Sequence, residues 1–335
     1  MELSILFDPS IGSCNMGDSI IFESARQELE MIVDGCLVMR CSTHQPVSTW
    51  YQNSGINPRT RRFDRAKYKF VCGSNLLWRR MLKPQPSWNI SLLNNRPYRG
   101  CILVGVGTHK GADSLDGYTK RLYQRVLSEK YAHSVRDKAT KELVEELGLR
   151  AINTGCPTMW GFTHDFCQQI PAEKADSVVF TLTDYGMDPS GDKKMIEVLD
   201  SSYEQIYFWP QGLSDEEYFY KIADSHVVKR VAILQPTLES FEKVLHSKEI
   251  DYIGTRLHAG IFAMQHKVRS IVIAIDNRVK DMRATYSFQS IDREEIEMLP
   301  GLINSSWITD IGIDEEAIVQ WKRQFLFDYK KEYGE

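Results

Sequence analysis

An arginine and a histidine flank a leucine at the start of a predicted helix in the stretch GTRLHAGIFAMQHKVRSIVIAIDNR, residues 254–278. The leucine belongs to the apolar stripe of that helix, so Arg256 and His258 lie off the stripe at its first turn. Free backbone N–H groups and an adjacent guanidinium at a helix start favour a bound phosphate or carboxylate. A histidine beside such an anion can transfer a proton at neutral pH. The alternative is structural: a surface ion pair for the arginine and a satisfied buried polar group for the histidine.

Three other strand-to-helix turns carry residues that suit a binding site. The turn NMGD supplies Asn15 and Asp18, which either cap the following helix or face a ligand. The turn CGSN, with Gly73 and Asn75, lets the backbone approach a ligand closely or simply reverses the chain. The turn SVRD places Arg136 where it can reach an anion in an interdomain cleft or form an ordinary ion pair. Because ligands of parallel α/β sheets gather beyond the strand ends, these turns form the candidate site.

Short apolar runs alternate with amphipathic segments through most of the chain, which predicts parallel sheets covered by helices on both faces. In the first half, strands are predicted at LSILFD, CLVMRC, KYKFVCG, CILVGVG, YAHSVRD and RAINTG, and helices at residues 18–30, 114–129 and 138–147. In the second half, strands are predicted at SVVFTLTDY, QIYFWPQG, VKRVAILQP, EIDYIGT and VRSIVIAID. The predicted class is α/β with two Rossmann-like domains.

The domain boundary is predicted in a stretch rich in Pro, Gly and turn residues. A chain of 335 residues is long for one hydrophobic core, and residues 156–175 separate the two periodic blocks. We therefore predict an N-terminal domain over residues 1–170 and a C-terminal domain over residues 171–335, with the boundary near Ile170. Residues 314–333 predict a charged amphipathic helix that can cover either sheet.

Composition and motifs exclude several classes of function. A formal net charge of -4 does not imply the broad basic face of a nucleic-acid-binding protein. Local basic residues in RTRRFDRAK, residues 59–67, form either a solvated loop or a site for an anionic substrate or membrane surface. The motifs GxxxxGK[ST], HExxH and GxSxG are absent, which removes the simplest NTPase, metalloprotease and serine-hydrolase hypotheses.

Cysteine usage and the lengths of the apolar runs predict a soluble, cytoplasmic protein. The seven cysteines show no CxxC pair and no Cys/His ligand spacing, so neither a disulfide framework nor a metal site is predicted. Several lie in apolar strand-like runs, where a reduced thiol packs as a small hydrophobe, as in a reducing cytosol. The N-terminus does not have the pattern of a signal peptide, and no apolar run approaches the roughly 20 residues of a transmembrane helix.

Taken together, the quoted motifs resemble those of the polysaccharide pyruvyl transferase family. The long RLHAGI block is the most specific, and NMGD, CGSN, SVRD and TGCP occur with it in the family's order over most of residues 5–280. One departure is His266-Lys267, where the family frequently has a glycine. The resemblance implies a fold like the two-domain GT-B glycosyltransferases, with the N-terminal domain on the acceptor side and the C-terminal domain on the donor side.

The resemblance also implies a reaction, in which a pyruvyl group passes from phosphoenolpyruvate to two hydroxyls of a saccharide. By similarity, Arg136, Arg256, Leu257 and His258 would contact phosphoenolpyruvate, with His258 as the acid/base group. Asn15 and Asp18 would lie nearer the acceptor, and Gly73 and Asn75 would line the site. The scheme requires no cofactor and no metal, and it would serve the biosynthesis of cell-surface polysaccharide or exopolysaccharide.

Two other hypotheses remain open at this point. A nucleotide-sugar glycosyltransferase would share the architecture and differ in its donor, and a non-catalytic sugar-binding protein would keep the cleft without turnover. The sequence does not identify the acceptor sugar or say whether it is lipid-linked. A protein without a transmembrane segment can still contact a membrane peripherally, and nucleic acid is not an expected partner.

Overall fold

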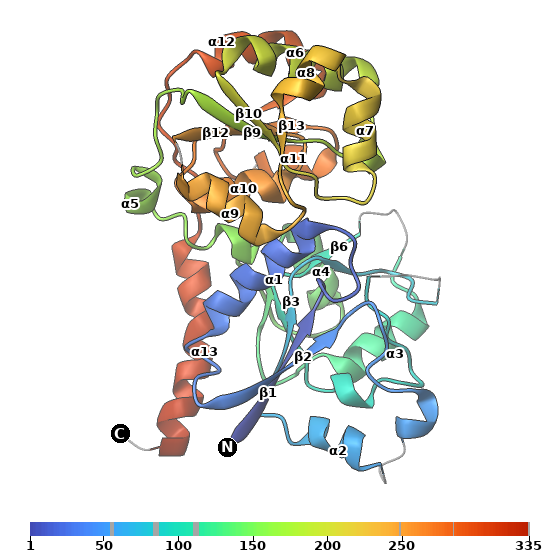
Figure 1. Cartoon of the computed structure of the whole chain (residues 1–335). Coiled ribbons are helices and arrows are strands. Elements are labelled where there is room, and N and C mark those ends of the chain that lie inside the picture. Colours follow the sequence, from blue (N-terminus) through green and yellow to red (C-terminus); the bar gives the residue numbers. More distant parts are fainter. Residues whose placement is uncertain (54–56, 83–86, 110–113, 248, 284, 334–335) are drawn as a thin grey trace. The chain divides into compact units, whose positions relative to one another are not determined.

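Every strand pairing in the described part of the chain is parallel. The structure is a computed structural model (Figure 1), and it describes residues 1–53, 57–82, 87–109, 114–247, 249–283 and 285–333. The chain forms two compact units. Unit 1 contains Met1–Ser13, Ile21–Trp160 and Asp314–Glu335, and unit 2 contains Cys14–Ile20 and Gly161–Ile313. The predicted α/β class with parallel sheets is therefore confirmed.

The central sheet of unit 1 has four strands in the order β2-β1-β3-β5. Their bounds are β1 (Glu2–Asp8), β2 (Cys36–Ser42), β3 (Tyr68–Cys72) and β5 (Ile102–Val104). Two-stranded ladders join β4 (Asn75–Leu77) to β6 (Gly107–Thr108) and β7 (His133–Val135) to β8 (Ala151–Asn153). Helix α1 (Met16–Leu29) begins in unit 2 and belongs to unit 1 from Ile21 onward. The other helices of unit 1 are α2 (Pro58–Asp64), α3 (Gly117–Val126), α4 (Lys138–Glu146) and α13 (Glu315–Tyr333), with 3-10 turns at Trp50–Asn53, Arg96–Tyr98 and Pro157–Met159.

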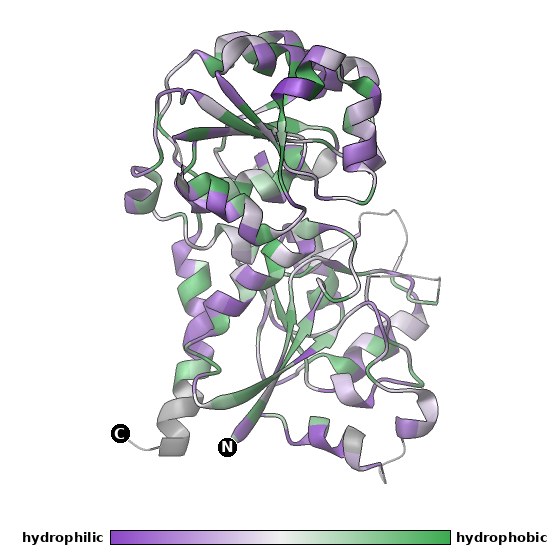
Figure 2. Ribbon diagram, in the orientation of Figure 1, coloured by the Kyte–Doolittle hydropathy of each residue, from purple (hydrophilic) through white to green (hydrophobic). Residues whose placement is uncertain are grey.

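Alternate residues of the unit 1 strands enter cores on opposite faces of the sheet. Val71 packs in one core with Leu122 of α3 and Leu143 of α4. The neighbouring Phe70 packs on the other face, with its ring 6.4 Å from that of Trp321 in α13. This two-residue alternation is what strands buried on both faces require, and Figure 2 shows the apolar character of the strands.

The terminal helix α13 belongs to unit 1, which corrects the prediction that residues 171–335 form one domain. Ile318, Trp321 and Phe325 are buried and spaced three and four residues apart, so they form one apolar face of the helix. The indole N–H of Trp321 donates a hydrogen bond of 2.8 Å to the carbonyl of Ala132. Burial of this aromatic face against unit 1 decides the assignment, and the chain leaves unit 1 after Trp160 instead of near Ile170.

Unit 2 has one sheet of six strands in the order β11-β10-β9-β12-β13-β14. Their bounds are β9 (Ser177–Thr181), β10 (Gln205–Phe208), β11 (Ala232–Ile233), β12 (Ile250–Gly254), β13 (Ser270–Ala274) and β14 (Ser290–Asp292). The helices are α5 (His164–Cys167), α6 (Pro189–Ser202), α7 (Asp215–Ile222), α8 (Ser225–Arg230), α9 (Leu238–Ser247), α10 (Leu257–Gln265), α11 (Asn277–Arg283) and α12 (Leu299–Ile303), with 3-10 turns at Asp184–Gly186 and Arg293–Met298. The short strand β14 was not predicted, because its three residues form no apolar run.

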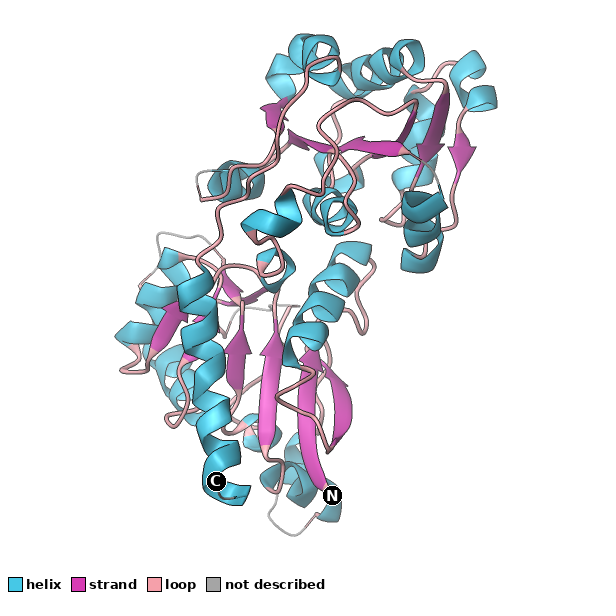
Figure 3. Ribbon diagram, turned by 90° about the vertical axis from the view of Figure 1, so that its left-hand side faces the viewer, coloured by secondary structure: helices cyan, strands magenta, loops and turns pink. Residues whose placement is uncertain are grey.

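Helices cover both faces of the unit 2 sheet (Figures 1 and 3). Phe180 of β9 packs in a core with residues of α6, α7, α8 and α12. Val179, its neighbour in the strand, packs in a second core with residues of α9 and α10. The strands are thereby buried on both sides, so only their carboxyl and amino ends are left for polar function. Among the described residues, no helix combines the length and the apolar character that crossing a lipid bilayer demands.

Candidate functional site

Three loops meet at the carboxyl edge of the unit 2 sheet. They follow β10, β9 and β12, which are neighbours in the strand order, so the loops lie side by side. Thr183, after β9, shares a hydrogen bond of 2.8 Å with the hydroxyl of Thr255, after β12. The amide of Thr255 also donates to the carbonyl of Thr181 at 3.2 Å. This edge is where parallel α/β sheets bind ligands.

A buried ion pair joins these loops. Arg256 is 4% exposed, and its Nη2 lies 2.6 Å and 2.7 Å from the two carboxylate oxygens of Asp215, which is 0% exposed. The same Nη2 donates to Asp184 Oδ1 at 3.1 Å, and Nε donates to the carbonyl of Leu182 at 2.9 Å. A guanidinium this deeply buried requires such partners, because an unpaired buried charge is very costly.

Asp215 also fixes the backbone of two loops. Its Oδ2 accepts hydrogen bonds from the amides of Gln211 (3.0 Å) and Gly212 (2.8 Å), and its Oδ1 accepts one from the amide of Asp184 (3.0 Å). Gly212 fits only because it has no side chain, since an added Cβ would lie 2.5 Å from Arg256 Nη2. One carboxylate therefore sets the positions of the loops after β9 and β10 and holds the arginine that precedes α10.

Two glycines explain how α10 comes so close to the sheet. A Cβ at Gly254 would lie 2.7 Å from the amide nitrogen of Thr181 in the neighbouring strand. A Cβ at Gly260 would lie 2.7 Å from Val272 and 2.9 Å from the ring of Tyr252. Both contacts are shorter than real Cβ contacts, so the spacing of glycines around RLHA reflects packing of β12 and α10.

Tyr252 supports the carbonyl at the start of α10. Its hydroxyl donates to the carbonyl of Arg256 at 2.8 Å and shares a hydrogen bond of 2.7 Å with Thr181 Oγ1. Burial raises the pKa of Tyr252 above its ordinary value, so the phenol stays neutral and acts as a donor. Arg256 is the N-cap residue of α10, and its conformation is therefore fixed from both its side chain and its backbone.

A small cavity opens beside this network, entirely within unit 2. Its volume is about 20 Å³, which is room for one or two water molecules, so a larger ligand requires the lining side chains to move. Tyr185 is the lining residue whose side chain can move most easily, because it is 58% exposed and its ring lies over the Arg256 guanidinium at 5.0 Å. The lining residues are Asn15, Gly17, Tyr185, Gln211, Thr255, Arg256, Leu257, His258, Ile275, Asp276 and Val279.

His258 and Leu257 lie where the sequence predicted them, in the first turn of α10 and at this cavity. Both side chains are half-buried, and the Nε2 atom of His258 is itself buried. An imidazole in that position lies beside the partial positive charge of the helix N-terminus. The geometry permits His258 to exchange a proton with a molecule that enters the cavity.

Gln211 is a site residue that the sequence analysis missed. It is 4% exposed, it lines the cavity, and its side-chain Nε2 is buried without a hydrogen-bond partner among the described residues. Such a buried donor is uncommon in proteins and is a natural site for a ligand acceptor. Gln211 lies in the loop after QIYFWP, and Asp215 is the first residue of α7 that follows that loop. No sequence pattern marks either residue, since acidic residues at a helix start are ordinary.

The predicted acceptor-side residues Asn15 and Asp18 separate in the structure. Asn15 precedes α1, its Oδ1 accepts a hydrogen bond of 3.1 Å from the amide of Gly17, and both residues line the cavity. Asp18 lies in the first turn of α1 and is not among the lining residues. Asn15 therefore lines the same cavity as His258, whereas Asp18 lies where a negative charge stabilises the start of a helix.

Arg136, Asn75 and Gly73 lie in unit 1, and two of them are in contact. Arg136 Nη2 donates a hydrogen bond to Asn75 Oδ1. An added Cβ at Gly107 would lie 2.4 Å from Asn75 Oδ1 and 2.7 Å from Arg136 Nη2, so this pair packs directly on the backbone. Gly73 has φ +67 and would place a Cβ 2.1 Å from Ile21, which gives it a packing role in its turn.

The candidate residues thus form two groups, one in each unit. Unit 2 brings together Arg256, Leu257, His258 and Asn15, and unit 1 brings together Arg136 and Asn75. The guanidinium of Arg256 already faces two carboxylates, whereas that of Arg136 has Asn75 and, at 3.7 Å, the neighbouring Asp137. A role for any of these side chains in substrate binding stays a prediction.

Comparison with known proteins identifies the family and the fold. The sequence profile of the polysaccharide pyruvyl transferases matches residues 15–277. No curated protein sequence matches the chain significantly. Among solved structures, the UDP complex of Staphylococcus aureus MnaA is 10% identical, with coverage of 98% of this chain and 97% of that chain and a TM-score of 0.51. The Neisseria meningitidis UDP-GlcNAc 2-epimerase is 11% identical, with coverage of 98% and 100% and a TM-score of 0.52. At these identities the similarity shows the fold, and the GT-B-like prediction is confirmed.

The buried ion pair generates a stability prediction. Replacing Asp215 with alanine leaves the Arg256 guanidinium without its closest partner, so we expect the free energy of unfolding to fall by about 3–5 kcal/mol. Asp184→Ala is the matched control, because the Asp184 side chain is 22% exposed and can be replaced by water at smaller cost. Urea unfolding followed by circular dichroism measures both variants. Equal stability of the two variants would contradict the central role given to Asp215.

Proposed function

Since the chain belongs to the polysaccharide pyruvyl transferase family, we propose that it transfers the pyruvyl group of phosphoenolpyruvate to two hydroxyls of a saccharide. The products are a cyclic ketal and inorganic phosphate. One hydroxyl proton ends on the methylene carbon, which becomes a methyl group, and the other leaves with phosphate. The reaction needs no redox step, and the scheme uses no metal and no cofactor.

The cavity at the start of α10 is the observation that carries the proposal. It combines a histidine with a buried Nε2 and a buried amide donor, Gln211 Nε2, next to the N-terminus of a helix. A three-carbon acid bearing a phosphate offers acceptors for these donors. His258 would protonate the methylene carbon, and the resulting oxocarbenium-like centre would then be attacked by a sugar hydroxyl.

The carboxylates around Arg256 limit its capacity to bind an anionic substrate. One guanidinium faces two carboxylates, so the cluster is not a cationic pocket by itself. We propose that Arg256 mainly positions the first turn of α10 and that the dianionic phosphate takes its hydrogen bonds from Gln211 and from backbone amides of that turn.

A cytoplasmic location and a role in cell-surface or exopolysaccharide synthesis are parts of the same proposal. The seven cysteines are all free, and those at positions 72, 101, 156 and 167 are buried, as expected in a reducing compartment. The acceptor is proposed to be a saccharide, either free or lipid-linked.

Unit 1 carries a surface that supports peripheral membrane contact. A hollow of about 1060 Å³ at the amino ends of β1 and β3 is lined by several basic residues, among them Arg61, Arg62 and Arg65, and also by Glu2. A neighbouring hollow, which shares Arg62, is lined by Leu37 and Val38, exposed by 58% and 38%. Basic side chains beside exposed apolar ones are the combination that binds an anionic lipid surface.

The role of His258 predicts a large loss of turnover on substitution. His258→Gln should lower the rate of acceptor-dependent phosphate release from phosphoenolpyruvate by about 100-fold or more, since general acid catalysis contributes that much. His164→Gln is the control, because the His164 side chain is 70% exposed and lies outside the cavity. Unchanged melting temperatures would show that both variants fold. Normal turnover of the His258 variant would rule out its role as the acid.

Donor identity is tested by ligand-induced stabilisation. Phosphoenolpyruvate should raise the melting temperature of the protein in a concentration-dependent way, because a ligand that binds only the folded state stabilises it. For Gln211→Leu, the phosphoenolpyruvate concentration needed for the same rise in melting temperature should be about tenfold higher, which corresponds to the loss of one hydrogen bond to a charged group. UDP and GDP are the comparison ligands. A larger shift with either nucleotide would favour a glycosyltransferase, and no turnover with any donor would favour a sugar-binding protein.

The basic and apolar surface predicts binding to anionic vesicles. The protein should sediment with phosphatidylglycerol vesicles and not with phosphatidylcholine vesicles, and less so as salt rises. Arg61→Gln with Arg65→Gln should weaken binding at least about tenfold, since each basic residue near the surface contributes about 1 kcal/mol. Lys138→Gln with Lys141→Gln removes the same charge from α4 and should have little effect. Equal binding by the two double variants would refute the surface.

A further inference from the structure

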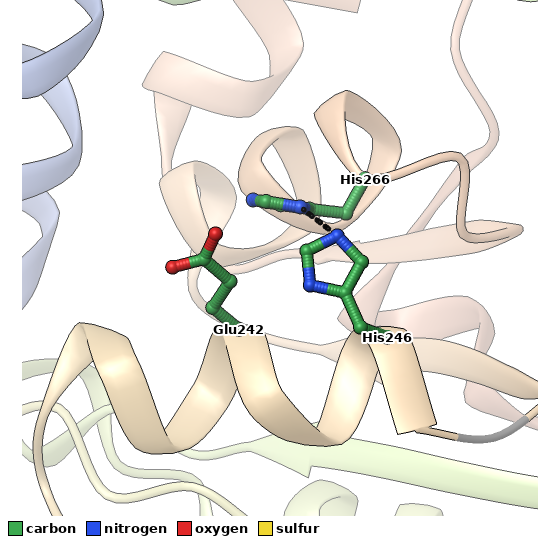
Figure 4. Close-up of side chains that lie close together, drawn as sticks. All are labelled: Glu242, His246 and His266. Carbon is green, nitrogen blue, oxygen red and sulfur yellow. Dashed lines mark hydrogen bonds between the residues drawn. The ribbon is translucent and has the colours of Figure 1, made fainter.

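Two histidines and a glutamate come together at the far end of α10 from the cavity (Figure 4). Glu242 and His246 lie four residues apart on α9, and His266 is the residue that caps the C-terminus of α10. One ligand atom of each residue lies within 4.8 Å of the others. The sequence did not predict this group, because its members come from two helices and include no cysteine.

The two imidazoles stand at the separation that a shared metal ion requires. His266 Nδ1 lies 3.2 Å from His246 Nε2. With Zn–N bonds of about 2.0–2.1 Å and tetrahedral angles, two ligating nitrogens lie about 3.3 Å apart. A hydrogen bond between neutral imidazoles accounts for the same nitrogen separation, but it does not account for the carboxylate that completes the group.

Packing between α9 and α10 holds the ring of His266 in place without any ion. The ring of His266 lies 4.4 Å from that of Phe262, which stacks in turn on Phe241 of α9 at 5.7 Å. Phe241 is fully buried in the core that α9 and α10 share. The two helices are therefore fixed relative to each other, which keeps the backbone positions that carry the three side chains close together.

The position also favours a cation. His246 lies in the last turn of α9, and His266 directly follows the last residue of α10. The carbonyl groups at helix C-termini carry a partial negative charge, and here two such termini meet beside the carboxylate of Glu242. The electrostatics and the ligand types thus point to the same kind of partner.

We propose that Glu242, His246 and His266 bind one divalent transition-metal ion of the zinc type, with water in the remaining position. Two imidazoles and one carboxylate are a ligand set that zinc takes in proteins, whereas magnesium and calcium prefer oxygen ligands alone. Bound metal would link the C-terminal ends of α9 and α10. Since His266 follows His258 by eight residues, this site lies about 12 Å along the helix from His258.

The test is zinc binding by the full chain without an affinity tag, measured by isothermal titration calorimetry. We expect one zinc ion per chain, and Glu242→Gln and His246→Gln should each weaken its affinity by at least about tenfold, the lower end of the loss that follows even an outer-shell change. His226→Gln is the control, because His226 is another exposed histidine of unit 2, with a side chain that is 68% exposed. Magnesium should give no heat of binding.

Cobalt supplies a second readout, because a four-coordinate cobalt ion absorbs visible light and its spectrum distinguishes thiolate ligands from nitrogen and oxygen ligands. Absorption that is lost in His246→Gln and retained in His226→Gln would support the site. Zinc affinity that is the same in the wild type and in both ligand variants would overturn it and leave a simple imidazole hydrogen bond. Neither readout uses pyruvyl transfer, so the outcome is independent of the proposed reaction.

Discussion

The arrangement of the unit 2 site depends on one buried interaction, the ion pair in which Arg256 Nη2 contacts both carboxylate oxygens of Asp215. Both side chains are almost completely buried, and a charge in that position is tolerated only with a well-aligned partner. The carboxylate also accepts three backbone amides, from Gln211, Gly212 and Asp184. The conformations of the loops after β9 and β10 and of the start of α10 are therefore coupled through a single side chain.

This constraint explains why the cavity offers neutral hydrogen-bond donors more than cationic side chains that could bind a ligand. Arg256 is held by carboxylates and by the carbonyl of Leu182, and it can reorient only if those bonds break. The polar groups at the cavity besides Arg256 include the imidazole of His258, the side-chain amide of Gln211 and the carboxylate of Asp276. A preorganised set of such groups stabilises developing charge without reorganisation, which is the property expected of a site that moves protons and expels phosphate.

The helix α10 connects the features of unit 2. Gly260 lets it pack closely on β12 and β13, its N-terminal turn carries His258, and His266 at its other end faces α9. The cavity and the cluster of Glu242, His246 and His266 therefore lie at opposite ends of one helix that packs closely on the sheet. The basic surface of unit 1 is separate again, at the amino ends of β1 and β3.

Local pattern in the sequence was sufficient for most of the longer strands, for several helices and for the placement of Arg256 and His258 at a helix start, because alternation and helix-start chemistry act over a few residues. It was also sufficient to recognise the family, since the motifs are contiguous. It did not reveal Asp215 and Gln211, which lie more than 40 residues from Arg256 and acquire their roles only when β10, β9 and β12 become neighbours. Nor did it assign α13, whose apolar face fits either sheet by pattern and is placed by burial of Trp321 and Phe325 in unit 1. Periodicity in the sequence shows that one face of a helix must be buried. Only the tertiary structure determines which sheet that face packs against, because contacts between distant residues depend on the strand order.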